Sequence, residues 1–441
     1  MGLDVARALA VLGMVGAHVG MTAEELKVLD PSTWSWLVHG RSSILFAVLA
    51  GISIALMTGR AQPPVTSELP AVRLGLLGRG AALFIIGILL ELLGTPVAII
   101  LTVYGLLYVA AIPFLTWRPR RLLVTAAVLA VAGPVLLASL RVLTLNTFGP
   151  GVDLVLFGTY PMTVWMALVL AGMGLGRLRL HTVRTAATLL AAGVVLTAAG
   201  YGLGALGGFV SSDTDDSDID DSSVIEEAAG VPADELKLDG ALCEDWGGGE
   251  YYCYPADQQE ETGDTTDTVV GEGDLLVIGE PDDSDSTDGW GEYVQGIAEE
   301  QPLESIVAAV FAVDPHSGGV AETVGSGGFA MAVIALCLLV SRPLRWVLLP
   351  LAALGSMPLT AYSAHVVAIL VIAGPGAVPG GEDAWGWFAL VLLVTTTAWS
   401  VLWGRGPLER LVARAAEAMQ GSRHAASREL SPVITGSKVE S

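Results

Sequence analysis

The chain has 441 residues, of which 53% are hydrophobic and 15% are charged, yet its formal net charge is -23 at pH 7. High hydropathy and a large charge excess rarely occur in the same segment, so they must be separated along the chain. Residues 211–305 contain 30 Asp and Glu and one Lys, whereas the rest carries 21 basic and 15 acidic residues. The remainder is apolar and slightly basic, which excludes a soluble enzyme and a nucleic-acid-binding protein. Three Cys are too few for a disulfide framework.

Apolar runs between charged, Pro or Gly positions divide the rest of the chain into about ten segments. A hydrocarbon core about 30 Å thick requires roughly 20 apolar residues for a helix to span it. These runs therefore predict an all-α, polytopic membrane helix bundle. The predicted spans are 3–22, 40–59, 77–95, 97–117, 121–141, 155–175, 184–209, 326–341, 345–373 and 384–404. The ninth is interrupted at Gly355, Ser356 and Pro358, which predicts a kinked or broken helix.

The short connections alternate between basic and acidic. Every second one carries Arg, and those between them carry mainly Asp and Glu. Because cytoplasmic loops are enriched in Lys and Arg, both termini are expected in the cytoplasm and the acidic insertion outside. We therefore expect a multi-pass protein of the cell membrane.

Four regions follow from this pattern. Residues 1–209 form an N-terminal membrane bundle, and 210–310 form an acidic extracytoplasmic loop that is expected to be largely disordered. Residues 311–410 supply the helices that complete the bundle, and 411–441 form a cytoplasmic tail. Within the loop, Cys243 and Cys253 flank an aromatic cluster, and an extracellular location favours a small disulfide loop.

Four of the six His fall at the outer level of the predicted bundle. They come from distant parts of the chain: His18, His39, His316 and His365. A single interfacial His usually only hydrogen-bonds a backbone carbonyl, but the coincidence of four favours a shared site. Arg41 lies at the same level and is also a candidate for this site.

Charged residues at the cytoplasmic level form a second group. Arg7 and Arg79 lie inside apolar runs, where an ionisable group is costly, and Arg73 precedes the third span. Asp4 lies one turn from Arg7, so these two side chains either pair with each other or belong to the same site. The group suits a phosphate-bearing cofactor, although basic cytoplasmic loops also occur in membrane proteins without a ligand.

Several segments resemble membrane acyltransferases of the heparan-alpha-glucosaminide N-acetyltransferase type and their bacterial relatives. LDVARALAVLGMVGAHVG (residues 3–20) is similar to their first helix, in which Asp, Arg and then His or Asn stand where this chain has Asp4, Arg7 and His18. GRSSILFAVLAGISIAL (residues 40–56) looks like their second helix. GSMPLTAYSAH (residues 355–365) resembles a companion bacterial domain. One feature departs from the pattern, because the eukaryotic enzymes have a His three residues before a Trp where this chain has Pro31 before Trp34.

The resemblance implies a cytoplasmic acyl-CoA donor, acetyl-CoA above all, and an extracytoplasmic glycan or lipid-linked envelope acceptor. His18 is then either a general base or an acylated relay. For an acyltransferase, we expect His39 or Arg41 to stabilise the oxyanion and Arg7, Arg73 and Arg79 to hold the phosphates of coenzyme A. His316 and His365 complete the catalytic candidates, and no metal site is expected.

Two other functions fit the same sequence. A transporter or flippase for an envelope precursor is equally compatible with a broken helix and intramembrane charges. A non-catalytic membrane scaffold or sensor, with the acidic loop as its functional part, is the third possibility. The oligomeric state does not follow from the sequence.

Overall fold

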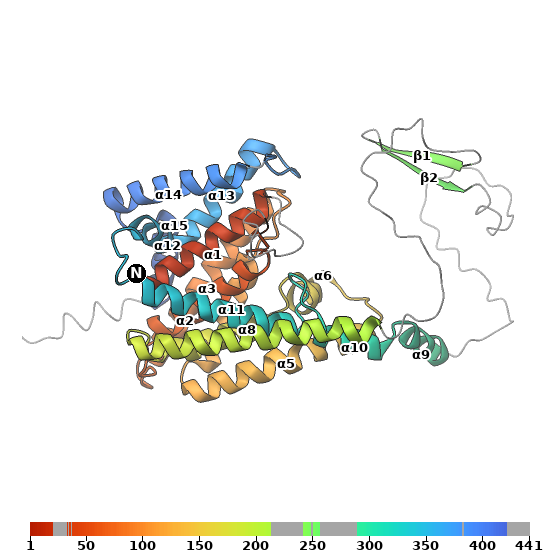
Figure 1. Ribbon diagram of the computed structural model, residues 1–441, viewed down its shortest axis with the longest axis horizontal. Coiled ribbons are helices and arrows are strands. Elements are labelled where there is room, and N and C mark those ends of the chain that lie inside the picture. The colour runs from red at the N-terminus through yellow and green to blue at the C-terminus, as the bar shows by residue number, and fades with distance from the viewer. Residues whose placement is uncertain are drawn as a thin grey trace, which may run out of the picture. The chain divides into compact units, whose positions relative to one another are not determined.

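The computed structural model describes residues 1–20, 33, 35–36, 38–212, 241–247, 250–255, 289–381 and 383–420. The chain divides into two compact units. The first comprises Met1–Asp213 and Gly289–Ser441, and its described elements are helical (Figure 1). The second, Thr214–Asp288, contains a two-stranded hairpin.

Helices account for nearly all regular structure of the first unit. The first half of the chain contributes α1 (Gly2–Val19), α2 (Arg41–Met57), α3 (Leu69–Glu91), α4 (Leu101–Ala110), α5 (Pro119–Leu143), α7 (Met162–Gly176) and α8 (Val183–Ser212), with short turns η2 (Ile112–Phe114), α6 (Pro150–Val152) and η3 (Asp153–Phe157). The second half contributes α9 (Gly289–Glu299), α10 (Pro302–Phe311), α11 (Val320–Val340), α12 (Leu349–Ser356), α13 (Pro358–Ala373), α14 (Ala384–Trp403) and α15 (Pro407–Gln420).

Six of the described helices are long and apolar enough to cross a membrane: α1, α3, α5, α8, α11 and α14. Two bent pairs, residues 150–176 and 349–373, raise the number to eight if each pair is one span. The prediction of a helical, multi-pass membrane bundle is therefore confirmed. The remaining two of the ten predicted spans fall on α2 and α4, which are shorter apolar helices, so the count of ten and the orientation stay predictions.

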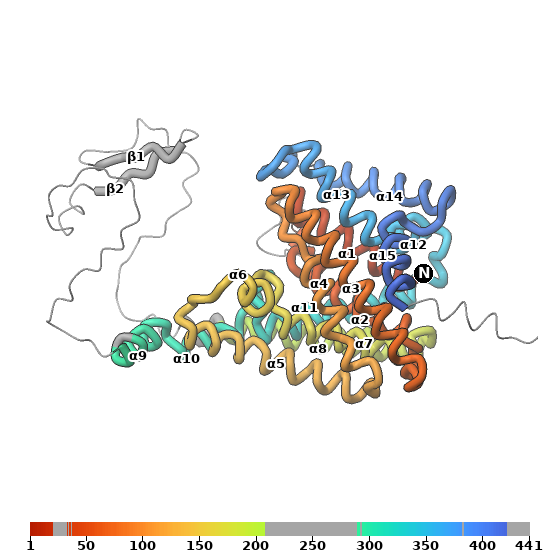
Figure 2. The backbone as a smooth tube through the Cα atoms, turned by 180° about the vertical axis from the view of Figure 1, so that it is seen from behind, coloured from red at the N-terminus to blue at the C-terminus, as the bar shows by residue number. Residues whose placement is uncertain are grey.

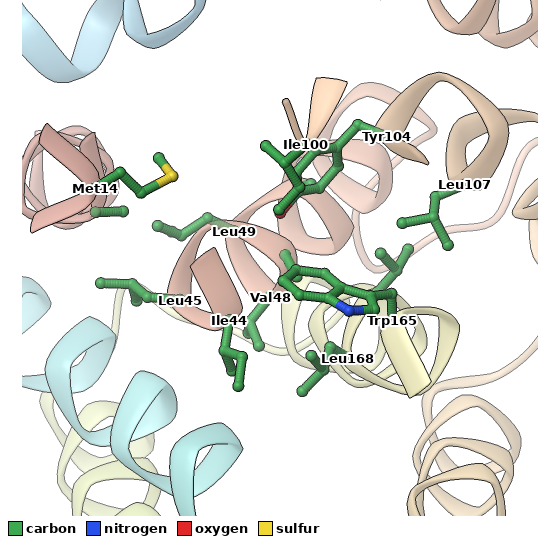
Figure 3. Close-up of a cluster of buried hydrophobic side chains, with 14 of the residues drawn as sticks. Met14, Ile44, Leu45, Val48, Leu49, Ile100, Tyr104, Leu107, Trp165 and Leu168 are labelled. Atoms are coloured by element: carbon green, nitrogen blue, oxygen red, sulfur yellow. The ribbon is translucent and has the colours of Figure 1, made fainter. Parts of the chain in front are cut away.

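The core is built around α2, which is apolar on all sides and buried along most of its length. Figure 3 shows the side chains that surround it: Met14 from α1 lies on the side of Leu45 and Leu49, and Trp165 from α7 lies on the side of Val48, where it meets Tyr104 from α4. Such packing fixes the relative rotation of these helices, because a close-packed interior leaves few gaps.

Close helix contacts depend on small residues. At the α2–α7 contact, a methyl group on Gly51 would overlap the carbonyl oxygen of Val169, and one on Gly172 would overlap that of Val48. Small residues allow membrane helices to approach this closely. The views in Figures 1 and 2 show α8 running beside α11, and α15 packs against α3.

The predicted break in the ninth span is present. The axes of α12 and α13 differ by 84°, and the break lies between Ser356 and Pro358. The first N–H groups of α13, on Leu359 and Thr360, donate to the carboxylate of Glu409 on α15 at 2.8 and 3.1 Å. A broken helix at membrane depth is tolerated when its freed backbone groups are satisfied in this way.

The predicted acidic loop contains more structure at its end than the sequence indicated. Its predicted disorder concerns mainly residues 213–240 and 256–288, which lie outside the described residues. Residues 289–311 form α9 and α10 and belong to the helical unit, because apolar side chains recur there at helical spacing. Of the predicted tail, residues 411–420 continue α15, and 421–441 lie outside the described part.

The hairpin of the second unit consists of β1 (Ala241–Gly247) and β2 (Glu250–Pro255), paired antiparallel. Its register places Cys243 directly opposite Cys253. This backbone pairing is compatible with the disulfide that the sequence predicts.

Candidate active site

Two imidazoles that are far apart in sequence meet near the end of α1. His18 is the penultimate residue of α1, and His365 lies in the middle of α13 with 1% of its surface exposed. His18 Nδ1 lies 2.9 Å from His365 Nε2, and the ring planes are 14° apart. A hydrogen bond between these nitrogens requires one to carry the hydrogen and the other to accept it. The pair therefore contains at least one neutral imidazole.

A small cavity lies beside this pair, which we call the imidazole cavity. Its volume is about 30 Å³, and its polar lining comprises His18, Ser42, Ser43, Tyr160, His316 and Tyr362. A polar space of this size can hold about one water molecule. It can therefore also take a single hydroxyl or amino group in the place of that water.

His316 is held beside the cavity by a carboxylate. It adopts a left-handed backbone conformation with φ +67°, and its N–H donates to Glu322 Oε1 at 2.8 Å. Glu322 Oε2 accepts from the N–H of Gly318 at 2.8 Å and the hydroxyl of Ser317 at 3.0 Å. The edge of the His316 ring meets Tyr160, with centroids 5.4 Å apart. Three charge-assisted hydrogen bonds thus fix the loop that carries His316.

Burial, together with a smaller effect of the nearby His39, lowers the pKa of His316 from 6.5 to about 4. Removing an imidazole from water disfavours its charged form. His316 is consequently neutral at pH 7 and can accept or relay a proton.

Arg41 and His39 lie next to this site and are not among the side chains that line the imidazole cavity. Arg41 is 5% exposed; its guanidinium donates to the hydroxyl of Tyr201 and the carbonyl of Trp36, both at 2.6 Å, and stacks on the Trp36 ring at 3.5 Å. The pKa of His39 is lowered by partial burial and by Arg41. In this arrangement Arg41 anchors the start of α2.

A second cavity lies toward the other end of α1, which we call the arginine cavity. Its volume is about 170 Å³, and its polar lining comprises Arg7, Ser53, Arg79, Tyr104, Tyr108 and Glu409. Arg7 donates to Asp4 at 2.6 Å and to Ser53 at 2.9 Å, so the expected Asp4–Arg7 pair is present. Arg73 is exposed on α3 and does not line this cavity.

The two cavities lie at different levels of the bundle. Arg7 and His18 are eleven residues apart on α1, or about 16 Å along a helix that rises 1.5 Å per residue. Tyr104 lines the arginine cavity, and its hydroxyl donates at 3.3 Å to the carbonyl of Ser43, which lines the imidazole cavity. A layer about one side chain thick therefore separates the two spaces.

Four residues of the two cavities and their surroundings were not predicted from the sequence: Glu322, Glu409, Tyr160 and Tyr362. An available signal was the position of the two Glu residues, since each is the acidic residue in the first turn of its helix. The two Tyr gave no such signal, because aromatic residues are common in membrane helices. Pro31 and Trp34, at which the sequence departs from the eukaryotic pattern, lie outside the described residues.

Fold and site together define a multi-pass helical membrane protein with a buried imidazole pair near one end of its first helix and an arginine-lined cavity toward the other. Residues 1–203 match the family described as heparan-alpha-glucosaminide N-acetyltransferase, catalytic. The matched part of the chain runs from α1 into α8 and contains His18, Arg7 and Arg79. The match indicates a membrane acyltransferase of the N-acetyltransferase type.

No curated protein and no solved structure is significantly similar to the chain. Within the described residues, no group of three or more His, Cys, Asp or Glu side chains is arranged to hold a metal ion. His365 and His316 lie beyond the matched residues, so the site combines family residues with residues from the C-terminal helices.

Proposed function

We propose that the protein transfers an acyl group, such as acetyl, from cytoplasmic acyl-CoA to a hydroxyl or amino group of an extracytoplasmic glycan or lipid-linked envelope component. The observation that carries the proposal is the position of His18. It belongs to the helix that matches the acetyltransferase family, it is hydrogen-bonded to His365, and it lines a cavity that has room for one acceptor group.

His18 acts as the general base in this mechanism. To accept a proton at Nε2, its Nδ1 must carry hydrogen, and this N–H then donates to His365 Nε2. The acceptor oxygen or nitrogen loses its proton to His18 and attacks the thioester carbonyl. The carbon–sulfur bond then breaks, and the thiolate of coenzyme A takes up a proton. His365 is a positioning residue, since it selects the competent tautomer of His18.

The hydroxyl of Tyr362 lines the same cavity and is a suitable donor to the developing oxyanion. In the alternative route, an imidazole is itself acylated and then passes the group to the acceptor. Both routes require the acyl group to cross the layer that contains Tyr104.

The arginine cavity suits the donor in part. Guanidinium groups such as those of Arg7 and Arg79 bind phosphate oxygens well. Sites for whole drug-sized ligands usually occupy about 300–1,000 Å³, so a space of about 170 Å³ takes only the acylated end of coenzyme A. The nucleotide end then extends toward the surface on which Arg73 is exposed.

The test uses the full chain in lipid nanodiscs with acetyl-CoA and an envelope glycan extract. We expect acetyl-CoA to raise the unfolding temperature and Arg79→Ala to weaken this effect. His18→Gln should bind acetyl-CoA normally and lose transfer of labelled acetyl groups at least 100-fold, since a positioned proton transfer contributes about 10² to 10⁴ in rate. His181→Gln is the matched control, because His181 is exposed and lies outside both cavities. Normal transfer by His18→Gln would remove His18 from the mechanism.

The 84° break between α12 and α13 favours a second function, which is transport of an envelope precursor. A transporter would carry substrate in liposomes without acyl-CoA. Substrate flux independent of acetyl-CoA, together with no binding of acetyl-CoA, would support transport over transfer.

A further inference from the structure

We propose that a third cavity, bounded by α5, α10 and the loop at residues 317–319, binds the acceptor as a neutral, hydroxyl-rich sugar unit. That this sugar is the acyl acceptor rests on the proposed function, but the binding of a sugar can be measured without acyl transfer. We call this space the polar cavity.

The polar cavity is large enough for a sugar. Its volume is about 340 Å³, within the range of about 300–1,000 Å³ that small-molecule sites occupy. Its polar lining comprises Arg141, Asn146, Glu300, Ser305 and Ser317, and its apolar lining includes Pro134, Leu137 and Pro161. Hydroxyl groups need polar partners and the C–H faces of a sugar ring need apolar ones, so the lining supplies both.

The charged groups of this cavity keep part of their hydrogen-bonding capacity. Asn146 Nδ2 donates to Glu300 Oε2 at 2.6 Å, and Arg141 Nη2 donates to the carbonyl of Phe157 at 2.8 Å. Among the described contacts, these use one carboxylate oxygen and one guanidinium nitrogen. A carboxylate has about four acceptor positions and a guanidinium has five N–H donors, so hydroxyl groups can be bound by both.

The charge of the lining favours a neutral ligand. Arg141 and Glu300 carry opposite charges and line the same space. A phosphate or carboxylate ligand would be attracted by Arg141 and repelled by Glu300, whereas an ammonium group would be attracted by Glu300 and repelled by Arg141. A hydroxyl group donates to one and accepts from the other without a net charge of its own.

The polar cavity adjoins the imidazoles. Pro161 and Gly318 line it and also line a void of about 10 Å³ that is bordered by His316 and Glu322. His316 in turn lines the imidazole cavity together with His18. A sugar in the polar cavity would therefore lie next to the loop that the Glu322 carboxylate holds. From this position one of its hydroxyl groups can reach toward His316.

Part of this cavity lies outside the family match. α10 follows the acidic insertion, and both α10 and the 317–319 loop lie beyond residue 203. We infer that the segment after the insertion provides acceptor specificity, while the matched helices carry Arg7 and Arg79 of the arginine cavity.

The experiment is saturation-transfer NMR on the full chain in nanodiscs, with methyl glucoside as the probe. We expect saturation transfer from the protein to methyl glucoside and little to glucose 6-phosphate. Glu300→Gln should weaken binding at least fivefold, because charge-assisted hydrogen bonds are about twice as strong as neutral ones. Ala309→Trp should abolish binding by filling the cavity, and Glu304→Gln, on the same helix but outside the lining, should leave it unchanged.

Two outcomes would overturn the inference: no saturation transfer to methyl glucoside, or unchanged binding in both Glu300→Gln and Ala309→Trp. Acetyl-CoA binding is measured on the same samples. If acetyl-CoA still stabilises the protein while sugar binding is absent, only the sugar site fails. If the sugar binds to the polar cavity but acetyl-CoA does not bind, the proposed acyltransferase function fails and the sugar site stands.

Discussion

The carboxylate of Glu322 is predicted to hold the loop that carries His316, and Glu322→Gln tests this role. The carboxylate accepts from two backbone N–H groups and one hydroxyl at 2.8–3.0 Å. A Gln amide has one oxygen, so one buried donor would face an NH₂ group at a cost of about 1–3 kcal/mol, and the other bonds would weaken. Relief of carboxylate desolvation offsets part of this loss and leaves about 2 kcal/mol for opening of the loop.

Hydrogen exchange of the loop measures this quantity directly. A change of about 2 kcal/mol corresponds to roughly 30-fold faster exchange of the amides of His316 and Gly318. Mass spectrometry of a peptide spanning residues 312–319 resolves it, and Glu304→Gln on α10 is the control. Acyl transfer should fall in the same variant, because His316 would lose its position. Exchange within threefold of the unaltered protein would refute the role assigned to Glu322.

Three further predictions concern pH, packing and the hairpin. Because the folded pKa of His316 is about 4 and its ordinary value is 6.5, the neutral form stabilises the fold fully above pH 6.5. About 3 kcal/mol of the free energy of unfolding is lost as the pH falls toward 4. The thermal unfolding of His316→Gln should lack this pH dependence. Gly355→Ala should destabilise the bundle by about 1–3 kcal/mol, because its methyl group would overlap a carbonyl of α1, whereas Gly380→Ala in open space should be neutral by the same assay. Intact mass under non-reducing conditions should show Cys243 and Cys253 joined, two hydrogens lighter than the reduced chain; free thiols at both would contradict the pairing.

Several residues of the two cavities could be predicted from the sequence, because charged and titratable groups are rare in membrane spans. Arg7 and Arg79 were recognisable as residues that need a cavity, and both line one. The sequence predicted that His18, His316 and His365 lie at the same depth of the bundle, because of where the apolar segments around them begin and end. Arg41 could not be assigned in this way, because the partner that orients it, Tyr201, is 160 residues away on α8.

The sequence by itself determined the membrane class, the positions of most spanning helices and the separation of the acidic insertion from the bundle, because the thickness of a bilayer and the cost of burying charge act on each segment alone. Only the tertiary structure decided that His18 meets His365 rather than His39, that Glu322 holds His316, and that α10 closes a polar cavity against α5. Helices that are apolar on every side carry no signal for their rotation or neighbours, so these contacts depend on how side chains of distant helices pack.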